Sequence, residues 1–182
     1  MIKKILKAIW TERKKMIEQP GKKKMLLFSG SSNVELAQKV ASNLGTELSE
    51  VERKEFASGE IYLRLGESVR GADCFVMQSH SGDINRTIME QLLMIDALKR
   101  ASAKRITAVL PFYPYSRQDK KALPREPISA RLISDMYVAA GVNRMVCKSI
   151  DTILLTPAAT YISLINLADI GSLGSAFLSC LE

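Results

Sequence analysis

The sequence predicts an α/β fold, a mostly parallel sheet with helices on both faces. The first observation is that short apolar stretches alternate along the chain with longer segments whose apolar residues recur at helical spacing. The second is the order itself, because strands separated by helices are typical of parallel pairing. The third is size and composition: 182 residues, 47% of them hydrophobic, with a mean hydropathy of +0.02, fit one globular domain and exclude a disordered chain.

The first third of the chain predicts two strands and one helix. Residues 25–28 are a short apolar run, which is typical of a buried strand. Ser32 and Glu35 form a capping box for a helix that Gly45 would end. The apolar residues that this helix turns inward are Leu36, Val40 and Leu44. Residues 61–65 alternate apolar and polar side chains, which predicts a half-buried strand.

The middle of the chain predicts a strand and a long helix. A turn at 70–73 precedes an apolar strand at 74–77. Asp83 or Asn85 can cap the helix that follows and runs to Arg100, with an apolar stripe for burial.

The next segments predict two more strands with a helix between them. Residues 105–110 form an apolar strand, and Pro127 suits the first turn of a helix that runs to Ala140 and ends at Gly141. A last short strand is expected at 145–147. Ligands of parallel sheets gather at the carboxyl ends of the strands, so the segments that follow the strands are the candidates for function.

The net charge lies at the start of the chain. The whole sequence carries 26 basic and 19 acidic groups, a net charge of +7. Residues 1–24 hold nine of the basic groups and two of the acidic ones, which leaves 17 of each sign in residues 25–182. We therefore expect a basic leader at 1–24, helical or disordered, on a neutral body. One alternative function is a module that binds nucleic acid or an anionic membrane through this leader, although we expect no nucleic-acid partner for the body.

Cysteine usage predicts a cytoplasmic protein. Cys74, Cys147 and Cys180 are odd in number and far apart, which favours reduced thiols. Neither they nor the single histidine, His80, have the spacing of a zinc site. No stretch approaches the roughly 18 uninterrupted apolar residues that a membrane span needs. Residues 147–182 form an apolar tail that could pack as a helix and a hairpin but carries no motif.

Two segments carry residues suited to a nucleotide. The segment at 111–121 joins aromatic rings, which stack on bases, to cationic and amide groups, which bind phosphates and base edges. The turn at 56–60 joins an aromatic ring to the carboxylate of Glu60, which can accept a hydrogen bond from the amino group of adenine. The simpler interpretations are an exposed charged loop and an ordinary Ser-Gly turn.

Familiar phosphate-binding motifs are missing. Neither G-x-x-x-x-G-K-[ST] nor G-x-G-x-x-G occurs, which removes the main support for a P-loop or a classical dinucleotide-binding fold. The loop at 79–83 precedes a helix and could bind an anion through backbone N–H groups. The alternative is that His80 is only a side chain of the capping loop.

A series of motifs in a fixed order resembles one family. The most specific run is Pro-Phe-Tyr-Pro-Tyr-Ser-Arg-Gln-Asp at 111–119, which follows Arg-Ile-Thr-Ala-Val at 105–109. The others are Leu-Phe-Ser-Gly at 27–30, Glu-Leu-Ala at 35–37, Phe-Ala-Ser-Gly-Glu at 56–60, Val-Arg-Gly-Ala-Asp at 69–73, Met-Glu at 89–90 and Asp-Ala-Leu-Lys-Arg-Ala at 96–101. From residue 25 to about 146 the chain resembles the amino-terminal half of ribose-phosphate pyrophosphokinases, the phosphoribosyl pyrophosphate synthetases, of the actinobacterial type.

This resemblance implies a phosphoribosyltransferase-like α/β fold and a cytoplasmic homo-oligomer. It also implies transfer of pyrophosphate from Mg-ATP to the anomeric hydroxyl of ribose 5-phosphate, a reaction of nucleotide biosynthesis. In the family, the F-x-[DN]-G-E turn of one subunit and the R-Q-D loop of its neighbour enclose the nucleotide. The residues that the resemblance assigns to ATP are Phe56, Ser58, Gly59, Glu60, Arg117, Gln118 and Asp119.

The chain departs from the family pattern at two places. Ser58 stands where the family has Asp or Asn, so one contact to the base is expected to be lost or bridged by water. Residues 147–151 read Cys-Lys-Ser-Ile-Asp where the family has a Val-Asp-Leu-His segment whose histidine helps to hold magnesium. We therefore assign no metal ligand and no catalytic residue in this chain.

Two functional hypotheses follow from the resemblance. The first is the amino-terminal half of a synthetase, truncated or frame-disrupted near residue 147, that keeps much of the ATP-binding surface and is weakly active or inactive alone. The second is a non-catalytic regulatory partner of a complete synthetase, which would use the same surface to join it.

Overall fold

Five parallel strands form the main sheet of the computed structural model, which describes residues 24–147 and 163–166. The strands lie in the order β1 (Met25–Ser29), β4 (Asp73–Met77), β5 (Arg105–Leu110), β6 (Arg144–Cys147) and β7 (Ser163–Asn166). Every neighbouring pair in this sheet is parallel. The parallel α/β fold expected from the order of the elements is thus confirmed.

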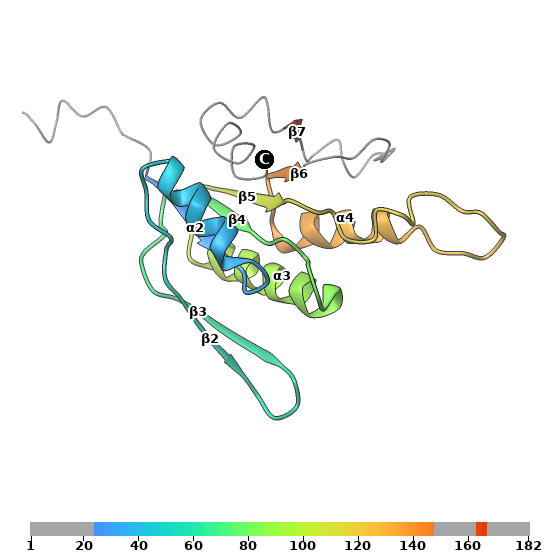
Figure 1. Ribbon diagram of the computed structural model, residues 1–182, viewed down its shortest axis with the longest axis horizontal. Helices are drawn as coiled ribbons and strands as arrows, with labels where there is room; N and C mark the ends of the chain where they lie inside the picture. The colour runs from blue at the N-terminus through green and yellow to red at the C-terminus, as the bar shows by residue number, and fades with distance from the viewer. Residues whose placement is uncertain (1–23, 148–162, 167–182) are drawn as a thin grey trace, which may run out of the picture.

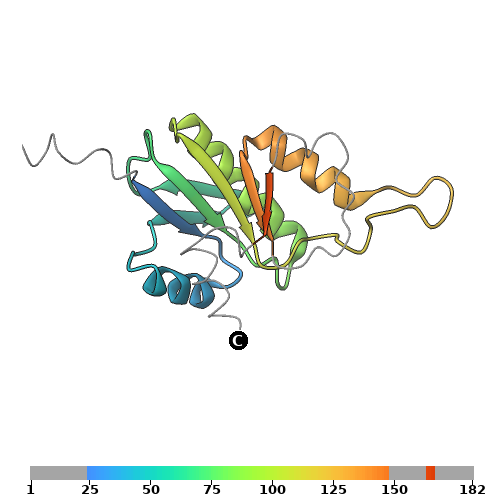
Figure 2. The same cartoon turned by 90° about the horizontal axis from the view of Figure 1, so that it is seen from above.

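In the described part of the chain, helices cover both faces of the sheet, as Figure 2 shows from above. Helix α2 (Val34–Asn43) lies on one face, and α3 (Ile84–Arg100) and α4 (Ser129–Ala140) lie on the other. Because successive strand residues point to opposite faces, β1, β4, β5 and β6 each contribute to two separate cores. The core under α2 contains Leu27, Phe75, Val109 and Val146 from the strands. The core under α3 and α4 contains Phe28, Val76, Ala108, Leu110 and Met145.

A two-stranded antiparallel hairpin projects from the body beside α3 (Figure 1). It consists of β2 (Val51–Glu55) and β3 (Ile61–Leu65). The sequence predicted β3, because its apolar residues alternate with polar ones. It did not predict β2, in which four of five residues are charged.

The observed boundaries correct two of the predicted elements. Asn33, and not Ser32, caps α2, since its side-chain oxygen accepts from the Leu36 N–H at 3.0 Å. Helix α4 begins at Ser129, so Pro127 precedes the helix instead of forming its first turn. Strand β7, which the sequence did not predict as a separate element, pairs in parallel with β6.

Several expectations concern residues that lie largely outside the described ones. These are the basic leader, of which only Lys24 is described, and the apolar tail apart from Cys147 and β7. Cys74 and Cys147 are free thiols, and burial raises their pKa values to about 11 and about 12. No helix within residues 24–147 is both long and apolar enough to cross a membrane.

Candidate functional site

The turn at 56–60 presents an aromatic ring and a carboxylate at the tip of the β2–β3 hairpin. The Phe56 N–H donates to the Glu60 carbonyl at 2.9 Å, and the Gly59 N–H donates to the Phe56 carbonyl at 2.8 Å. Gly59 has a φ of +85°, a conformation that side chains rarely adopt. The Ser58 hydroxyl donates to the Glu60 carboxylate at 3.0 Å, so Ser58 holds the neighbouring acceptor in place.

The ring of Phe56 is available for stacking. It is 57% exposed and forms a T-shaped pair with Tyr62, with ring centroids 6.4 Å apart and planes at 73°. A phenylalanine ring exposed to this extent offers apolar surface on which a planar ring can stack.

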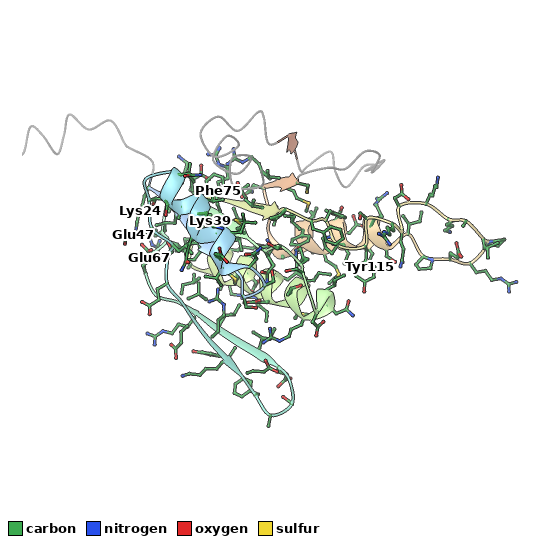
Figure 3. All side chains as sticks on the ribbon, viewed as in Figure 1. Lys24, Lys39, Glu47, Glu67, Phe75 and Tyr115 are labelled. Atoms are coloured by element: carbon green, nitrogen blue, oxygen red, sulfur yellow. The ribbon has the colours of Figure 1, made fainter. Side chains whose placement is uncertain are left out.

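The segment at 111–128 leaves the carboxyl end of β5 and returns to α4 (Figure 1). Tyr113 anchors its start, because its buried hydroxyl contacts the Ala130 carbonyl at 2.8 Å and Ser134 at 2.6 Å. Burial raises the pKa of Tyr113 to about 12, so this hydroxyl keeps its proton. Tyr115, labelled in Figure 3, has a φ of +57° and donates to the Asn85 side chain at the start of α3, at 2.5 Å.

A pocket of about 380 Å³ opens between this segment and the start of α3. Its volume falls in the usual range of ligand pockets, about 300–1,000 Å³. Gln118 is fixed at its wall, since its N–H donates to the Tyr115 carbonyl at 2.9 Å and its side-chain oxygen accepts from Ser129 at 2.5 Å. The lining residues are Ile84, Asn85, Phe112, Tyr115, Ser116, Arg117 and Gln118.

This lining combines apolar, cationic and amide groups. Phe112 is 48% exposed and offers a ring face, while Arg117 offers up to five N–H donors. The Gln118 side-chain oxygen already accepts a hydrogen bond from Ser129. The NH₂ group of the same side chain can donate to a ligand. The pocket therefore suits a planar ring joined to an anion. Asp119, also predicted here, follows Gln118 in the chain but is not among the lining residues.

The two predicted parts of the site are not brought together within one chain. The hairpin and the 111–128 segment project from the body in different directions (Figure 1). The pocket that contains Arg117 and Gln118 includes no residue of the 56–60 turn. The described chain thus carries two separate surfaces, each with part of the predicted residues.

His80 is a core residue and offers no side chain to an anion. It is 1% exposed, and its ring contacts Thr87 Oγ1 at 3.2 Å, Gln91 Oε1 at 3.0 Å and the Tyr137 hydroxyl at 3.2 Å. Burial lowers its pKa to about 4, so the imidazole is neutral at pH 7. The His80 side chain therefore fits the interpretation of a structural residue in the loop before α3.

A buried polar cluster beneath the hairpin was missed by the sequence interpretation. At its centre lies the carboxylate of Glu90 on α3, whose side chain is 2% exposed. It accepts from Arg53 Nε at 2.9 Å, from the Ser31 hydroxyl at 2.6 Å and from Gln78 Nε2 at 2.8 Å. The available signal was the position of Glu90 on the buried face of α3, next to the buried Gln91.

A second pocket, of about 210 Å³, lies at the opposite end of the strands. Its lining includes Asp73 at the start of β4 and Arg105 at the start of β5. These two side chains already form an ion pair, and Arg144 approaches Asp73 at 3.6 Å. Its distance from the carboxyl ends of the strands makes this pocket the weaker candidate.

Comparison with known proteins points to one group. A family model described as the N-terminal domain of ribose phosphate pyrophosphokinase matches residues 25–141. Curated proteins named ribose-phosphate pyrophosphokinase are similar over much of the chain. The one from Corynebacterium efficiens is 59% identical over 130 residues, which are 71% of this chain and 40% of that protein. The one from Streptomyces coelicolor is 54% identical over 136 residues, 75% of this chain and 42% of that protein.

A solved structure gives the same result. The crystal structure of phosphoribosylpyrophosphate synthetase from Mycobacterium smegmatis superposes with a TM-score of 0.72 at 49% identity. The alignment covers 79% of this chain and 47% of that one. The chain thus spans about 40% of the length of the curated relatives it matches and about half of the solved one.

Proposed function

Because this chain belongs to the ribose-phosphate pyrophosphokinase family, whose N-terminal domain it contains, we propose that it binds ATP through the 56–60 turn and the 111–128 segment. Phe56 would stack on the adenine, while Ser58, Gly59 and Glu60 would form the turn that meets its edge. Arg117, Gln118 and Asp119 would face the rest of the nucleotide, with Arg117 on the phosphates.

The observation that carries this proposal is the pocket beside Arg117. It lies at the carboxyl end of β5, where parallel sheets place their ligands, and it joins ring faces to a cation and an amide. The exposed, uncovered ring of Phe56 adds the stacking surface that an adenine requires.

The separation of the two surfaces supports a site shared between two copies. A hairpin that projects from the body can reach the 111–128 segment of a neighbouring chain, although it does not reach its own. We propose a homo-oligomer in which each nucleotide lies between the hairpin of one chain and the segment of the next.

We propose the complete reaction, transfer of pyrophosphate from Mg-ATP to ribose 5-phosphate, for a chain of the full length of the family. Phosphoryl transfer needs stabilisation of the charge that spreads over the phosphate oxygens. Within residues 24–147 and 163–166, no three His, Cys, Asp or Glu side chains lie close enough to hold a metal ion. Magnesium therefore enters the proposal with the ATP, and no step is assigned to a protein-bound ion. We expect this chain alone to bind ATP with weak or no turnover.

Binding is tested by isothermal titration calorimetry of the purified chain with Mg-ATP. Wild type should bind, and Arg117→Ala should bind about tenfold or more weakly, because it loses a charge-assisted phosphate contact. Arg125→Ala, a charge loss at a left-handed position of the same segment, is the control and should bind like the wild type. A wild type that binds no ATP would refute the proposal.

A second candidate function is that of a regulatory partner. The observation that favours it is the same pair of exposed half-surfaces, which a complete synthetase subunit could complement. Size-exclusion chromatography of this chain with a full-length relative tests it. Co-elution with altered turnover of the relative supports the regulatory function, and separate elution rejects it.

A further inference from the structure

The hairpin turns a charged strand toward the body. Residues of β2 that share a face alternate, so Val51, Arg53 and Glu55 lie on one side. In the antiparallel register these residues are opposite Leu65, Leu63 and Ile61 of β3. Leu63 and Leu65 pack against the core under α3, so this face is the inner one. Arg53 thus points toward α3 from the strand that leads to Phe56.

Arg53 joins the hairpin to two elements of the body at once. Its Nε donates to Glu90 Oε1 on α3 at 2.9 Å, and its Nη2 donates to the Ser29 carbonyl at the end of β1. Glu90 is itself held by the Ser31 N–H, the Ser31 hydroxyl and Gln78. The acceptor that Arg53 meets is therefore rigid.

The burial of Glu90 makes this contact stronger than the other charge pairs of the hairpin. The Glu90 side chain is 2% exposed and that of Arg53 is 31% exposed. The second pair between the hairpin and α3, Arg86 with Glu55 at 2.6 Å, is 41% and 50% exposed. Exposed pairs contribute little because water competes for both partners, whereas removing one partner of a buried pair leaves an uncompensated charge.

We propose that Arg53 is a positioning residue that fixes the pose of the 56–60 turn through Glu90 and the Ser29 carbonyl. Arg53 lies three residues before Phe56, on a strand whose one apolar residue, Val51, is at the opposite end from the turn. With Arg53 locked, the stacking ring and the carboxylate of Glu60 are held at a fixed angle to the body. This proposal rests on the proposed ATP-binding function, for which it names the residue that orients the base-binding half.

The experiment compares Arg53→Met with Arg64→Met, a matched charge loss on the same hairpin. Arg64 is 72% exposed and its nearest carboxylate, that of Glu52, is 3.9 Å away. Hydrogen exchange at the Phe56 and Gly59 amides reports the order of the turn, because both N–H groups are bonded within it. Calorimetry with Mg-ATP and with inorganic tripolyphosphate separates the base-binding half from the phosphate-binding half.

In Arg53→Met, hydrogen exchange at these two amides should be about fivefold or more faster than in the wild type. The variant should bind ATP about tenfold more weakly, while its affinity for tripolyphosphate should stay within about twofold of the wild type. Arg53→Lys should give values between those of the wild type and Arg53→Met. It keeps a positive charge beside Glu90 but loses the forked guanidinium that also reaches the Ser29 carbonyl. If Arg53→Met fails to fold, Arg53→Met with Glu90→Gln removes both charges, and the same exchange and affinity changes are expected.

The outcomes separate the inference from the proposed function. Exchange and ATP affinity equal to those of Arg64→Met would overturn the positioning role. Faster exchange with unchanged ATP affinity would overturn it too, since the pose would then not serve the nucleotide. A wild type that binds no ATP refutes the proposed function, and the exchange rates alone then decide whether Arg53 fixes the hairpin.

Discussion

Acidification should destabilise this fold through one histidine. His80 is 1% exposed, and burial lowers its pKa to about 4, whereas a histidine in an unfolded chain titrates near 6.5. Between these two pH values the unfolded state takes up a proton that the folded state does not. The contribution of His80 is therefore fully present above about pH 6.5 and is lost as the pH falls toward about 4.

The two pKa values set the size of the effect. The linkage relation gives a loss of about 2 kcal/mol in the free energy of unfolding between pH 7 and about pH 4.5. Ordinary carboxylates also begin to take up protons toward the acid end of this range, so the wild-type profile alone does not isolate the histidine. The difference between the wild type and a variant that cannot titrate at position 80 does isolate it.

Urea unfolding followed by far-ultraviolet circular dichroism at both pH values measures this difference. His80→Asn is the suitable variant, because asparagine tolerates the φ of +53° at this position better than most residues. We expect the variant to be less stable at pH 7 but to lose about 2 kcal/mol less than the wild type on acidification. Parallel profiles for the two proteins would refute the assignment of a buried neutral imidazole.

Three further predictions follow. Phe56→Ala should weaken ATP binding by about 1–3 kcal/mol in calorimetry and leave the melting temperature unchanged, since the ring is 57% exposed. Ser58→Asn should tighten ATP binding several-fold in the same assay, because an amide reaches further than a hydroxyl and both donates and accepts; weaker binding would contradict this. Gly30→Ala should cost about 2 kcal/mol in urea unfolding, because its Cβ would lie 2.3 Å from the buried Gln78 side chain; an unchanged midpoint would contradict the close packing.

Most of the sheet was predictable from the sequence because its strands are buried on both faces. Strands such as β4 and β5 are then nearly continuous apolar runs, in which Thr107 is the one polar residue after the first position. Strand β2 was missed for the opposite reason. Of its inner positions only Val51 is apolar, while Arg53 and Glu55 pair with charged residues of α3, so the strand shows no apolar alternation.

The parts of the candidate site were predicted from the residues, whereas its division between two subunits was expected only from the family resemblance. The composition of the 111–121 segment pointed to a ligand, and the structure places a pocket beside Arg117 and Gln118. The distance between this pocket and the 56–60 turn is a property of the tertiary fold, which residue spacing does not contain. Glu90 was missed because a single carboxylate on an apolar helix face is assigned to solvent unless its partners, here Arg53 and Gln78, are known.

The two cores of the sheet differ in whether residues of the nucleotide surfaces pack on them. The hairpin residues Leu63 and Leu65 and the pocket residue Tyr115 pack on the core under α3 and α4, whereas the core under α2 receives none of them. Substitutions under α2, such as at Val40, should then change the stability of the whole domain without changing the geometry of the nucleotide surfaces, and their free energies should add to those of changes on the other face. An engineer who needs a more robust version of this domain would work on the α2 side.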